Sequence, residues 1–374
     1  MRKRLACLML ALLLPLSALG EEETEEVFAT SAKAAILIDA ASGRILYEMN
    51  AYQALPMAST TKVMTALLAM EYGKLEEMVT AEKNAFGVPG TSIYLALGEK
   101  LTLRQMLYGL MLASGNDAAV AIAEHIGGTL ESFCRKMTER AAELGCQNTV
   151  FKTPHGLPNS EHHSTAYDMA LIAREAMTHT LFRTIVSTEK ANIPWEGRSY
   201  SRVLNNKNKL LSSFEGATGI KTGYTKAAGR CLLFSAERDG MEVIGVVLNC
   251  GDWFNEAARI MDGGFANYHY IDFMKRDAVV QTIPVANGEA EAVEGILEAD
   301  LGGVFEKAQQ PILKVALPSE IVGDAQKGEP LGTARLYEGD LFIAEAAIIA
   351  KETVKMRSFR RNIERTLIKW LPAE

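Results

Sequence analysis

The stretch Ser59-Thr60-Thr61-Lys62 decides the fold of this chain, because two further motifs, Ser114-Gly115-Asn116 and Lys221-Thr222-Gly223, follow it in order. Together the motifs supply a nucleophile, a nearby amine base, a second hydroxyl, an amide and a cationic strand. A hydroxyl is a poor nucleophile until a base takes its proton. The ordered set therefore predicts a site that opens an amide bond through an acyl-serine, which no single motif would establish.

The first motif predicts an amine beside a hydroxyl at the start of a helix. Ser59 closely follows Pro56, and backbone N–H groups at a helix start point toward incoming negative charge. Lys62 is three positions later, about one turn away on the same face. Its amine can act as a base only if burial and a second cation, for which Lys221 is the candidate, lower its pKa. The pattern alone is weak evidence, since Ser187-Thr188-Glu189-Lys190 has it too.

The other two motifs each have a structural and a functional interpretation. Ser114-Gly115-Asn116 follows a helix-period run rich in Leu and Met, and its residue types also favour helix-ending turns. In the functional interpretation, Ser114 relays a proton to the leaving group, while Asn116 holds the substrate's backbone amide and helps place Lys62. Gly223, on a predicted strand, lets a substrate backbone approach closely. Lys221 and Thr222 could then bind a carboxylate of that substrate. A lysine on an edge strand beside a bulge is the alternative.

Hydrophobic periodicity indicates an α/β (α+β) fold, with an antiparallel sheet packed by helices. Helix-period stretches are predicted at 56–73, 101–127, 130–144, 166–177 and 255–275. Strands are predicted at 34–39, 45–49, 220–224, 231–236 and 242–249, with one hairpin joining the first two and another joining the last two. Short runs at 279–284, 312–317, 331–337 and 341–347 then predict a small β-sandwich-like domain. The predicted domains are therefore residues 31–275 and 276–350.

Both ends of the chain resemble targeting segments. Residues 1–20 combine a basic start, an apolar run from Leu5 to Leu16 and the small-residue site Ala18-Leu19-Gly20, which is typical of a signal peptide; an uncleaved anchor is the alternative. Residues 351–374 hold seven basic and three acidic side chains. Apolar and basic residues recur on two different helical faces, which predicts an amphipathic helix on an anionic membrane surface. A terminal helix docked on the protein is the alternative.

Charge and cysteine content limit the possible partners and cross-links. Removal of the three basic residues of the signal from a total of 39 leaves 36, against 46 acidic residues, so the formal charge is −10. A nucleic-acid partner is not expected, because phosphate binding needs a basic surface. Cys231 and Cys250 lie on two runs joined by a predicted hairpin turn and could form a disulfide, whereas free thiols are the alternative. The sequence does not decide whether Cys134 and Cys146 pair.

With its three motifs in this order, the chain resembles the serine acyl-transferases that penicillin inhibits, in particular the low-molecular-mass D-alanyl-D-alanine carboxypeptidases of the penicillin-binding protein 5 kind. Asp117-Ala118 follow the middle motif and Tyr224-Thr225 follow the third, as in that family. Thr153–Leu157 and Ser164–Ala170 also resemble family segments, so the similarity spans essentially the whole mature chain. Thr61 precedes the lysine where the family often has leucine, which leaves the motif intact.

The resemblance implies a β-lactamase/transpeptidase-like domain and an acyl-serine mechanism. Ser59 would be the acylated nucleophile, Lys62 its base and Ser114 a proton relay. The backbone N–H groups of Ser59 and Tyr224 would form an oxyanion hole, typically worth a few kcal/mol of transition-state stabilisation. Lys221, Thr222 and Thr225 would hold the terminal carboxylate of D-alanine. The full set of implied substrate-binding residues is Asn116, Lys221, Thr222, Gly223, Tyr224 and Thr225.

The activity that the resemblance implies is removal of the terminal D-alanine from peptidoglycan pentapeptide stems. It would take place at the outer face of the cytoplasmic membrane, with β-lactams as covalent inhibitors and no cofactor. Two alternatives stay open: a serine β-lactamase on the same scaffold, and a non-catalytic penicillin-binding scaffold of the cell wall. The additional β domain and tail argue against the first alternative, and the intact motifs argue against the second.

His155, His162 and His163 cluster in a polar loop, where a zinc carboxypeptidase would need ligands. No H-E-x-x-H motif occurs, and the spacing matches no standard zinc site. We therefore expect these three to be surface loop residues and expect no metal.

Overall fold

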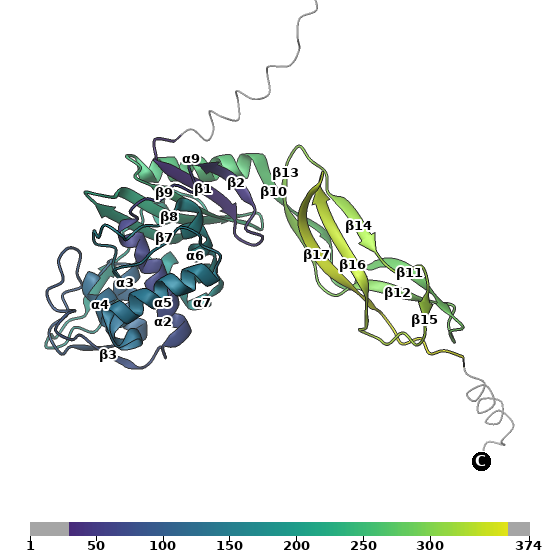
Figure 1. Cartoon of the computed structure of the whole chain (residues 1–374), viewed down its shortest axis with the longest axis horizontal. Helices are drawn as coiled ribbons and strands as arrows, with labels where there is room; N and C mark the ends of the chain where they lie inside the picture. Colours follow the sequence, from purple (N-terminus) through teal and green to yellow (C-terminus); the bar gives the residue numbers. More distant parts are fainter. Residues whose placement is uncertain (1–29, 358–374) are drawn as a thin grey trace, which may run out of the picture.

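The computed structural model describes residues 30–357, so the predicted signal peptide at 1–20 lies outside the described residues. The chain forms a mixed α/β body and an elongated β-rich body, which follow one another along the long axis of the molecule (Figure 1). Helix α9 (Trp253–Asn267) runs along the top of the first body and leads into strand β10 (Tyr268–Met274) of the second. Within residues 30–357, no helix combines the length and the apolar character that a membrane span requires.

The first body is built on a five-stranded antiparallel sheet in the order β2-β1-β9-β8-β7. Side chains alternate between its faces, so that Ile36 and Ile38 enter one hydrophobic core and Leu37 enters the other. Both predicted hairpins are confirmed. The strands are β1 (Ala34–Asp39), β2 (Ile45–Met49), β7 (Ala217–Thr225), β8 (Gly229–Arg238) and β9 (Met241–Leu248).

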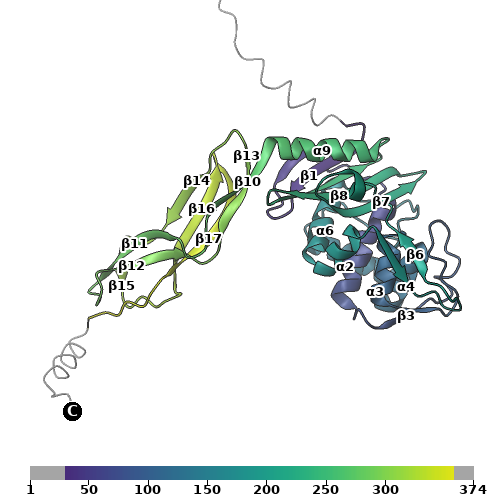
Figure 2. The same cartoon turned by 180° about the vertical axis from the view of Figure 1, so that it is seen from behind.

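Helices cover both faces of this sheet, and Figure 2 shows α9 on one side and α2 and α6 on the other. Side chains at the N-termini fix where several helices begin; Thr165, for example, accepts a hydrogen bond from the Asp168 N–H at 3.0 Å. The helical layer contains α2 (Lys62–Tyr72), α3 (Leu103–Met111), α4 (Asn116–Gly127), α5 (Leu130–Glu143), α6 (Ala166–Thr178) and α7 (Thr180–Ser187).

The predicted helix over 101–127 is interrupted. Strand β4 (Lys100–Thr102) precedes α3, and α3 and α4 are separated by a turn in which Ser114 adopts a positive φ of 63°. Short elements complete the body: a 3-10 turn η1 (Ala58–Thr61), β3 (Met78–Thr80), the pair β5 (Lys190–Ile193) and β6 (Arg202–Asn205), and α8 (Leu210–Ser213).

The second body is a β structure, as predicted, but it begins earlier than the sequence indicates. The predicted helix over 255–275 is wrong after Asn267, because residues 268–274 form β10 and pair with β13 (Leu301–Glu306). This pair packs on a six-stranded sheet through a core that includes Phe305 and Ile348. The sheet contains β14 (Ile312–Ala316), β16 (Pro330–Glu338), β17 (Leu341–Ala350), β12 (Ala292–Leu297), β11 (Val279–Ala286) and β15 (Ile321–Val322).

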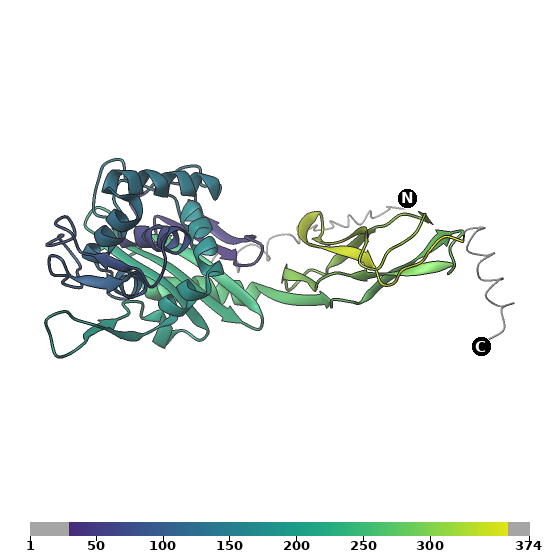
Figure 3. The same cartoon turned by 90° about the horizontal axis from the view of Figure 1, so that it is seen from below.

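A mostly buried ion pair joins the two bodies, which Figure 3 shows end to end. Arg44, in the β1–β2 turn, pairs with Glu338, the last residue of β16, and their side chains are 11% and 9% exposed. Arg44 also donates to the Val304 carbonyl at 2.8 Å, and its guanidinium lies 5.2 Å from the Tyr268 ring centre. Glu338 in turn accepts the Glu306 N–H at 2.8 Å, so both charges are satisfied within the contact.

One further prediction about the chain needs correction, and one open question about its cysteines is answered. Residues 351–357 are not helical, because Val354 and Met356 form isolated β-bridges to Ala325 and Gly288; the rest of the predicted amphipathic helix, 358–374, lies outside the described residues. The sequence left open whether Cys231 and Cys250 form a disulfide; they do not, and all four cysteines of the described part are free. The reason is geometric: the side chains of Cys231 and Cys250 enter the opposite hydrophobic cores on the two faces of the sheet.

Candidate active site

The first motif lies where η1 passes into α2, against strand β7. Ser59 belongs to η1, and Lys62 is the first residue of α2, so the one-turn spacing expected from the sequence brings Lys62 Nζ to 2.9 Å from Ser59 Oγ. A Cβ on Gly223 would lie 2.8 Å from the Ser59 nitrogen. Only glycine allows β7 to approach the motif so closely, because any side chain at this position would clash with the backbone.

The amine of Lys62 is fully buried and has three neighbours. Besides Ser59 Oγ, Nζ lies 2.7 Å from Asn116 Oδ1 and 2.8 Å from the His155 carbonyl oxygen. Carbonyl oxygens can only accept hydrogen bonds, so the two N–H groups of a neutral amine are directed to them. The nitrogen lone pair is then left for the Ser59 hydroxyl proton, which is the geometry that a general base requires.

Burial lowers the pKa of Lys62 far below its ordinary value, and the positive charges of Lys221 and Lys207 lower it further. This is the direction that the sequence predicts. Within residues 30–357, no carboxylate forms a salt bridge with Lys62, although the more distant Asp117 raises the pKa in part. The site therefore favours the neutral amine.

The second motif forms the turn between α3 and α4. Ser114 is buried and adopts a positive φ, and Asn116 begins α4. Asn116 is held on both sides: its Nδ2 donates to the Pro89 carbonyl at 2.7 Å and its backbone N–H donates to the Thr91 carbonyl at 2.7 Å. Its Oδ1 is thereby aimed at Lys62. The motif thus forms a helix-ending turn, and the same turn places the Asn116 amide beside Lys62.

The third motif lies on β7, which is an edge strand of the sheet and packs against η1. Because side chains alternate along a strand, Lys221, Gly223 and Thr225 share one face, and Gly223 shows that this face meets Ser59. Lys221 is buried, donates to the Thr222 carbonyl at 3.0 Å, and has its pKa lowered to about 7 by burial and by Lys207. Thr222 is buried, whereas Tyr224 is exposed.

Three contributions to the site were not predicted from the sequence. Lys207, in the loop after β6, lies 3.5 Å from the Thr91 hydroxyl and supplies, besides Lys221, a second positive charge that acts on Lys62. The His155 carbonyl binds Lys62, although the sequence drew attention only to the imidazole. Asp117, known from the sequence only as a family marker, is buried and accepts the N–H groups of Ile93 and Leu95, so it holds the loop before β4 against the first turn of α4.

A cavity of about 570 Å³ adjoins the site at Ala58 and Thr225. Leu55, Leu157 and Pro158 form much of its wall. The side chains that line it carry no acidic group, lysine or arginine, so it suits an uncharged part of a ligand.

The prediction that all three clustered histidines are surface residues is wrong for His162. His162 is 4% exposed, and its imidazole lies 2.8 Å from the Thr61 hydroxyl. His155 Nδ1 accepts the Leu157 N–H at 3.2 Å, and His163 Nδ1 lies 2.9 Å from the Glu161 carbonyl. Each imidazole thus makes its own hydrogen bond, His162 with η1 and the other two within the loop.

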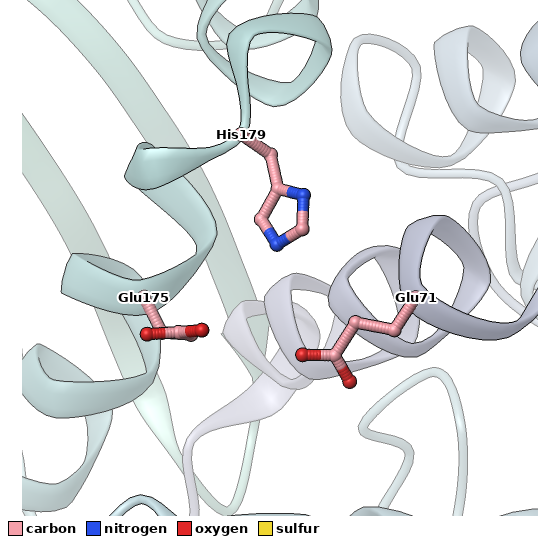
Figure 4. A group of neighbouring side chains, drawn as sticks. All are labelled: Glu71, Glu175 and His179. Carbon is pink, nitrogen blue, oxygen red and sulfur yellow. The ribbon is translucent and has the colours of Figure 1, made fainter.

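Glu71, Glu175 and His179 form the one group of potential metal ligands found among residues 30–357 (Figure 4), and Glu71 lies toward the opposite end of α2 from Lys62. Arg140 already bonds both carboxylates: its Nε lies 3.0 Å from Glu71, and its Nη2 lies 3.2 Å from Glu175. The guanidinium thus supplies the positive charge that a cation would bring, and the group serves as an ion-pair cluster between α2, α5 and α6.

Comparison with known proteins decides the family. The sequence profile of the peptidase S11 family, described as D-alanyl-D-alanine carboxypeptidase, matches residues 21–251. The chain belongs to the D-alanyl-D-alanine carboxypeptidase family. It is 34% identical over 353 residues to the carboxypeptidase DacF of Bacillus subtilis, covering 91% of this chain and 90% of that protein.

Further relatives of this carboxypeptidase-family chain support the full-length match. DacC of Escherichia coli is 33% identical over 363 residues, covering 92% of this chain and 89% of the relative. Among solved structures, penicillin-binding protein 5 of Haemophilus influenzae superposes with a TM-score of 0.72 at 27% identity, over 87% of this chain and 98% of that one. The fold class expected from the sequence is confirmed, including the β-rich second body.

Proposed function

We propose that this chain is a serine-type D-alanyl-D-alanine carboxypeptidase of the penicillin-binding kind, which removes the terminal D-alanine from peptidoglycan pentapeptide stems. The observation that carries the proposal is the position of Lys62 Nζ, 2.9 Å from Ser59 Oγ and bonded otherwise only to the carbonyl oxygens of Asn116 and His155. Membership of the carboxypeptidase family supports the same reaction.

In this reaction, Ser59 attacks the carbonyl carbon of the penultimate D-alanine while its proton passes to Lys62. Backbone N–H groups of Ser59 and Tyr224 stabilise the oxyanion. The peptide C–N bond then breaks, and a proton relayed through Ser114 leaves with the amine of the terminal D-alanine. Water, deprotonated by Lys62, hydrolyses the ester and restores the free serine.

The edge of β7 fixes how the stem peptide lies in this proposal. A peptide that adds antiparallel to β7 has its C-terminal end near Lys221 and its N-terminal part beyond Thr225. The terminal carboxylate then meets the cations Lys221 and Lys207, with Thr222 and Thr225 as hydroxyl donors. The preceding stem residues reach the uncharged cavity next to Ala58.

The extracytoplasmic setting is also part of the proposal. Removal of residues 1–20 as a signal peptide would place the enzyme outside the cytoplasmic membrane, where its substrate and β-lactam inhibitors are found. Residues 351–374, of which only 351–357 are described, would contribute basic charge toward the membrane surface. Deleting residues 358–374 should release the protein from membranes and leave peptidase activity unchanged; a truncated form that still sediments with membranes would contradict the anchoring role.

The proposed reaction is tested by incubating the protein with a peptide ending in D-Ala-D-Ala and measuring free D-alanine. We expect the wild type to release D-alanine and Ser59→Ala to release none. Ser187→Ala is the matched control, because Ser187 heads the second serine-lysine pattern yet lies in α7 and donates to the Arg183 carbonyl. No D-alanine release by the wild type, with β-lactam binding retained, would contradict the carboxypeptidase. Rapid nitrocefin turnover would instead favour the β-lactamase alternative.

A further inference from the structure

The residue before the nucleophile has an unfavourable backbone conformation. Ala58 has a φ of 50°, in the left-handed region that residues with a Cβ rarely adopt. It is 1% exposed and directly precedes Ser59 at the start of η1. Such a conformation is unfavourable and persists only where surrounding contacts hold it.

Thr61 and His162 provide contacts that hold Ala58. The Thr61 hydroxyl donates to the Ala58 carbonyl at 2.8 Å, and the same hydroxyl lies 2.8 Å from His162 Nε2. A hydroxyl has one proton, so with that proton on the Ala58 carbonyl the imidazole must donate. At the other side of the ring, the Lys152 N–H donates to His162 Nδ1 at 2.9 Å. Both contacts require the same tautomer, with the proton on Nε2.

The loop that carries His162 also presses on Ala58 and reaches the base. Gly156 packs directly on the Ala58 carbonyl, where a Cβ would lie 1.8 Å from the oxygen. The carbonyl of the preceding residue, His155, accepts from Lys62 at 2.8 Å. One segment therefore contacts both the base Lys62 and the residue that precedes Ser59, and His162 is its buried connection to η1.

We propose that Thr61 and His162 form a positioning pair that holds Ala58 in its left-handed conformation and thereby aims the Ser59 hydroxyl at Lys62. This inference rests on the proposed function only in taking Ser59 as the nucleophile. It also gives a physical role to the Thr61 hydroxyl, which an aliphatic side chain at this position could not replace as an acceptor for the imidazole. Burial lowers the pKa of His162 to about 4, which keeps the ring neutral with one fixed donor at neutral pH.

The test measures acylation of the full-length protein by a fluorescent penicillin, separating the rate constant of acylation from the affinity of the preceding non-covalent complex. We expect Thr61→Val, which keeps the shape and removes the hydroxyl, to lower the acylation rate constant by about tenfold or more, with the affinity changed by less than about threefold. Thr61→Ser should restore the rate to within about threefold of wild type. His162→Leu should match Thr61→Val, and His162→Gln, which offers an amide donor, should lie between His162→Leu and the wild type.

Two comparisons separate positioning from general destabilisation. Thr184→Val removes a hydroxyl that donates to the Thr180 carbonyl at 2.9 Å within α7, outside the site, so it should acylate at the wild-type rate. The double variant Thr61→Val/His162→Leu should be no slower than the slower single variant, because each single change breaks the same chain of hydrogen bonds. The proposal would be overturned if Thr61→Val acylated at the wild-type rate, if Thr184→Val lost as much as Thr61→Val, or if the losses multiplied in the double variant.

A spectroscopic measurement tests the pair without reference to any activity. Long-range proton–nitrogen correlation spectra should show His162 with its proton on Nε2 at neutral pH, and the Nε2 resonance should shift in Thr61→Val. A proton on Nδ1, or a spectrum insensitive to Thr61→Val, would overturn the inference even if acylation is normal. Loss of D-alanine release with intact acylation would count against the carboxypeptidase reaction and not against the pair.

Discussion

Replacing Lys221 by methionine should stabilise the folded protein at neutral pH and weaken its site. Lys221 is fully buried, and its pKa is lowered from 10.5 to about 7 in the fold. The unfolded chain therefore binds a proton that the native state gives up between these two pH values, and unfolding is favoured in proportion. At pH 7 this linkage costs the fold roughly 4 kcal/mol, and at pH 9 roughly 2 kcal/mol.

The sign determines the experiment. A lysine with a depressed native pKa makes the fold less stable at low pH, and stability is regained as the pH rises toward the unfolded value. Urea unfolding at pH 7 and pH 9 should thus show the wild type gaining about 2 kcal/mol that Lys221→Met does not gain. Lys226→Met, an exposed neighbour on the same strand end, should follow the wild type. Equal pH slopes in wild type and Lys221→Met would refute the reasoning.

Three further predictions concern other parts of the molecule. Asn116→Asp places a carboxylate beside Lys62, raises the pKa of its amine, and should lower β-lactam acylation at pH 7 by roughly tenfold or more, with recovery as the pH rises in a pH–rate profile. Arg44→Ala leaves Glu338 unpaired in the contact between the two bodies and should destabilise by roughly 3 kcal/mol in calorimetry, with unchanged D-alanine release from a short peptide. The lowered pKa of His162 should make the unfolding free energy fall by up to roughly 3 kcal/mol from pH 6.5 to pH 4, and His162→Leu should lack that fall.

Each of these three has a result that would speak against it. An unchanged pH–rate profile in Asn116→Asp would show that Lys62 is not the titrating base. Arg335→Ala, which breaks an exposed pair with Glu345, should change stability by less than about 1 kcal/mol, and an equal loss in both arginine variants would deny the buried contact its role. Identical acid sensitivity of His162→Leu and wild type would mean that another group unfolds the protein.

The sequence predicts correctly those strands and turns whose formation depends on residues close together in the chain. Strands β1 and β2 have the predicted bounds, because alternating side chains and the Gly43 turn specify a hairpin within a few residues. Residues 268–274 were assigned to a helix in error, since their strand conformation depends on β13, about thirty residues later. Two glycines weaken the strand signal of β13 itself, so the pairing of β10 with β13 could not be predicted from either segment.

The sequence predicts those parts of the site that consist of side chains within one short motif. The nearness of Lys62 to Ser59 follows from helical spacing, and the lowered pKa of the amine follows from the chemistry of a base. By contrast, the His155 carbonyl and the Lys207 charge come from loops, and only tertiary packing brings them to the amine. The hydrogen bond between Thr61 and His162 could not be predicted either, because His162 is about a hundred residues away and lies in a polar stretch typical of a surface loop.

Mass spectrometry of the folded protein after exposure to benzylpenicillin tests the central claim most directly, namely that the buried neutral amine of Lys62 activates the Ser59 hydroxyl. We predict a single penicilloyl adduct on the peptide spanning Met57 to Lys62, and none on the peptide that carries Ser187. An unmodified Ser59 in folded protein, or an adduct at another serine, would contradict it.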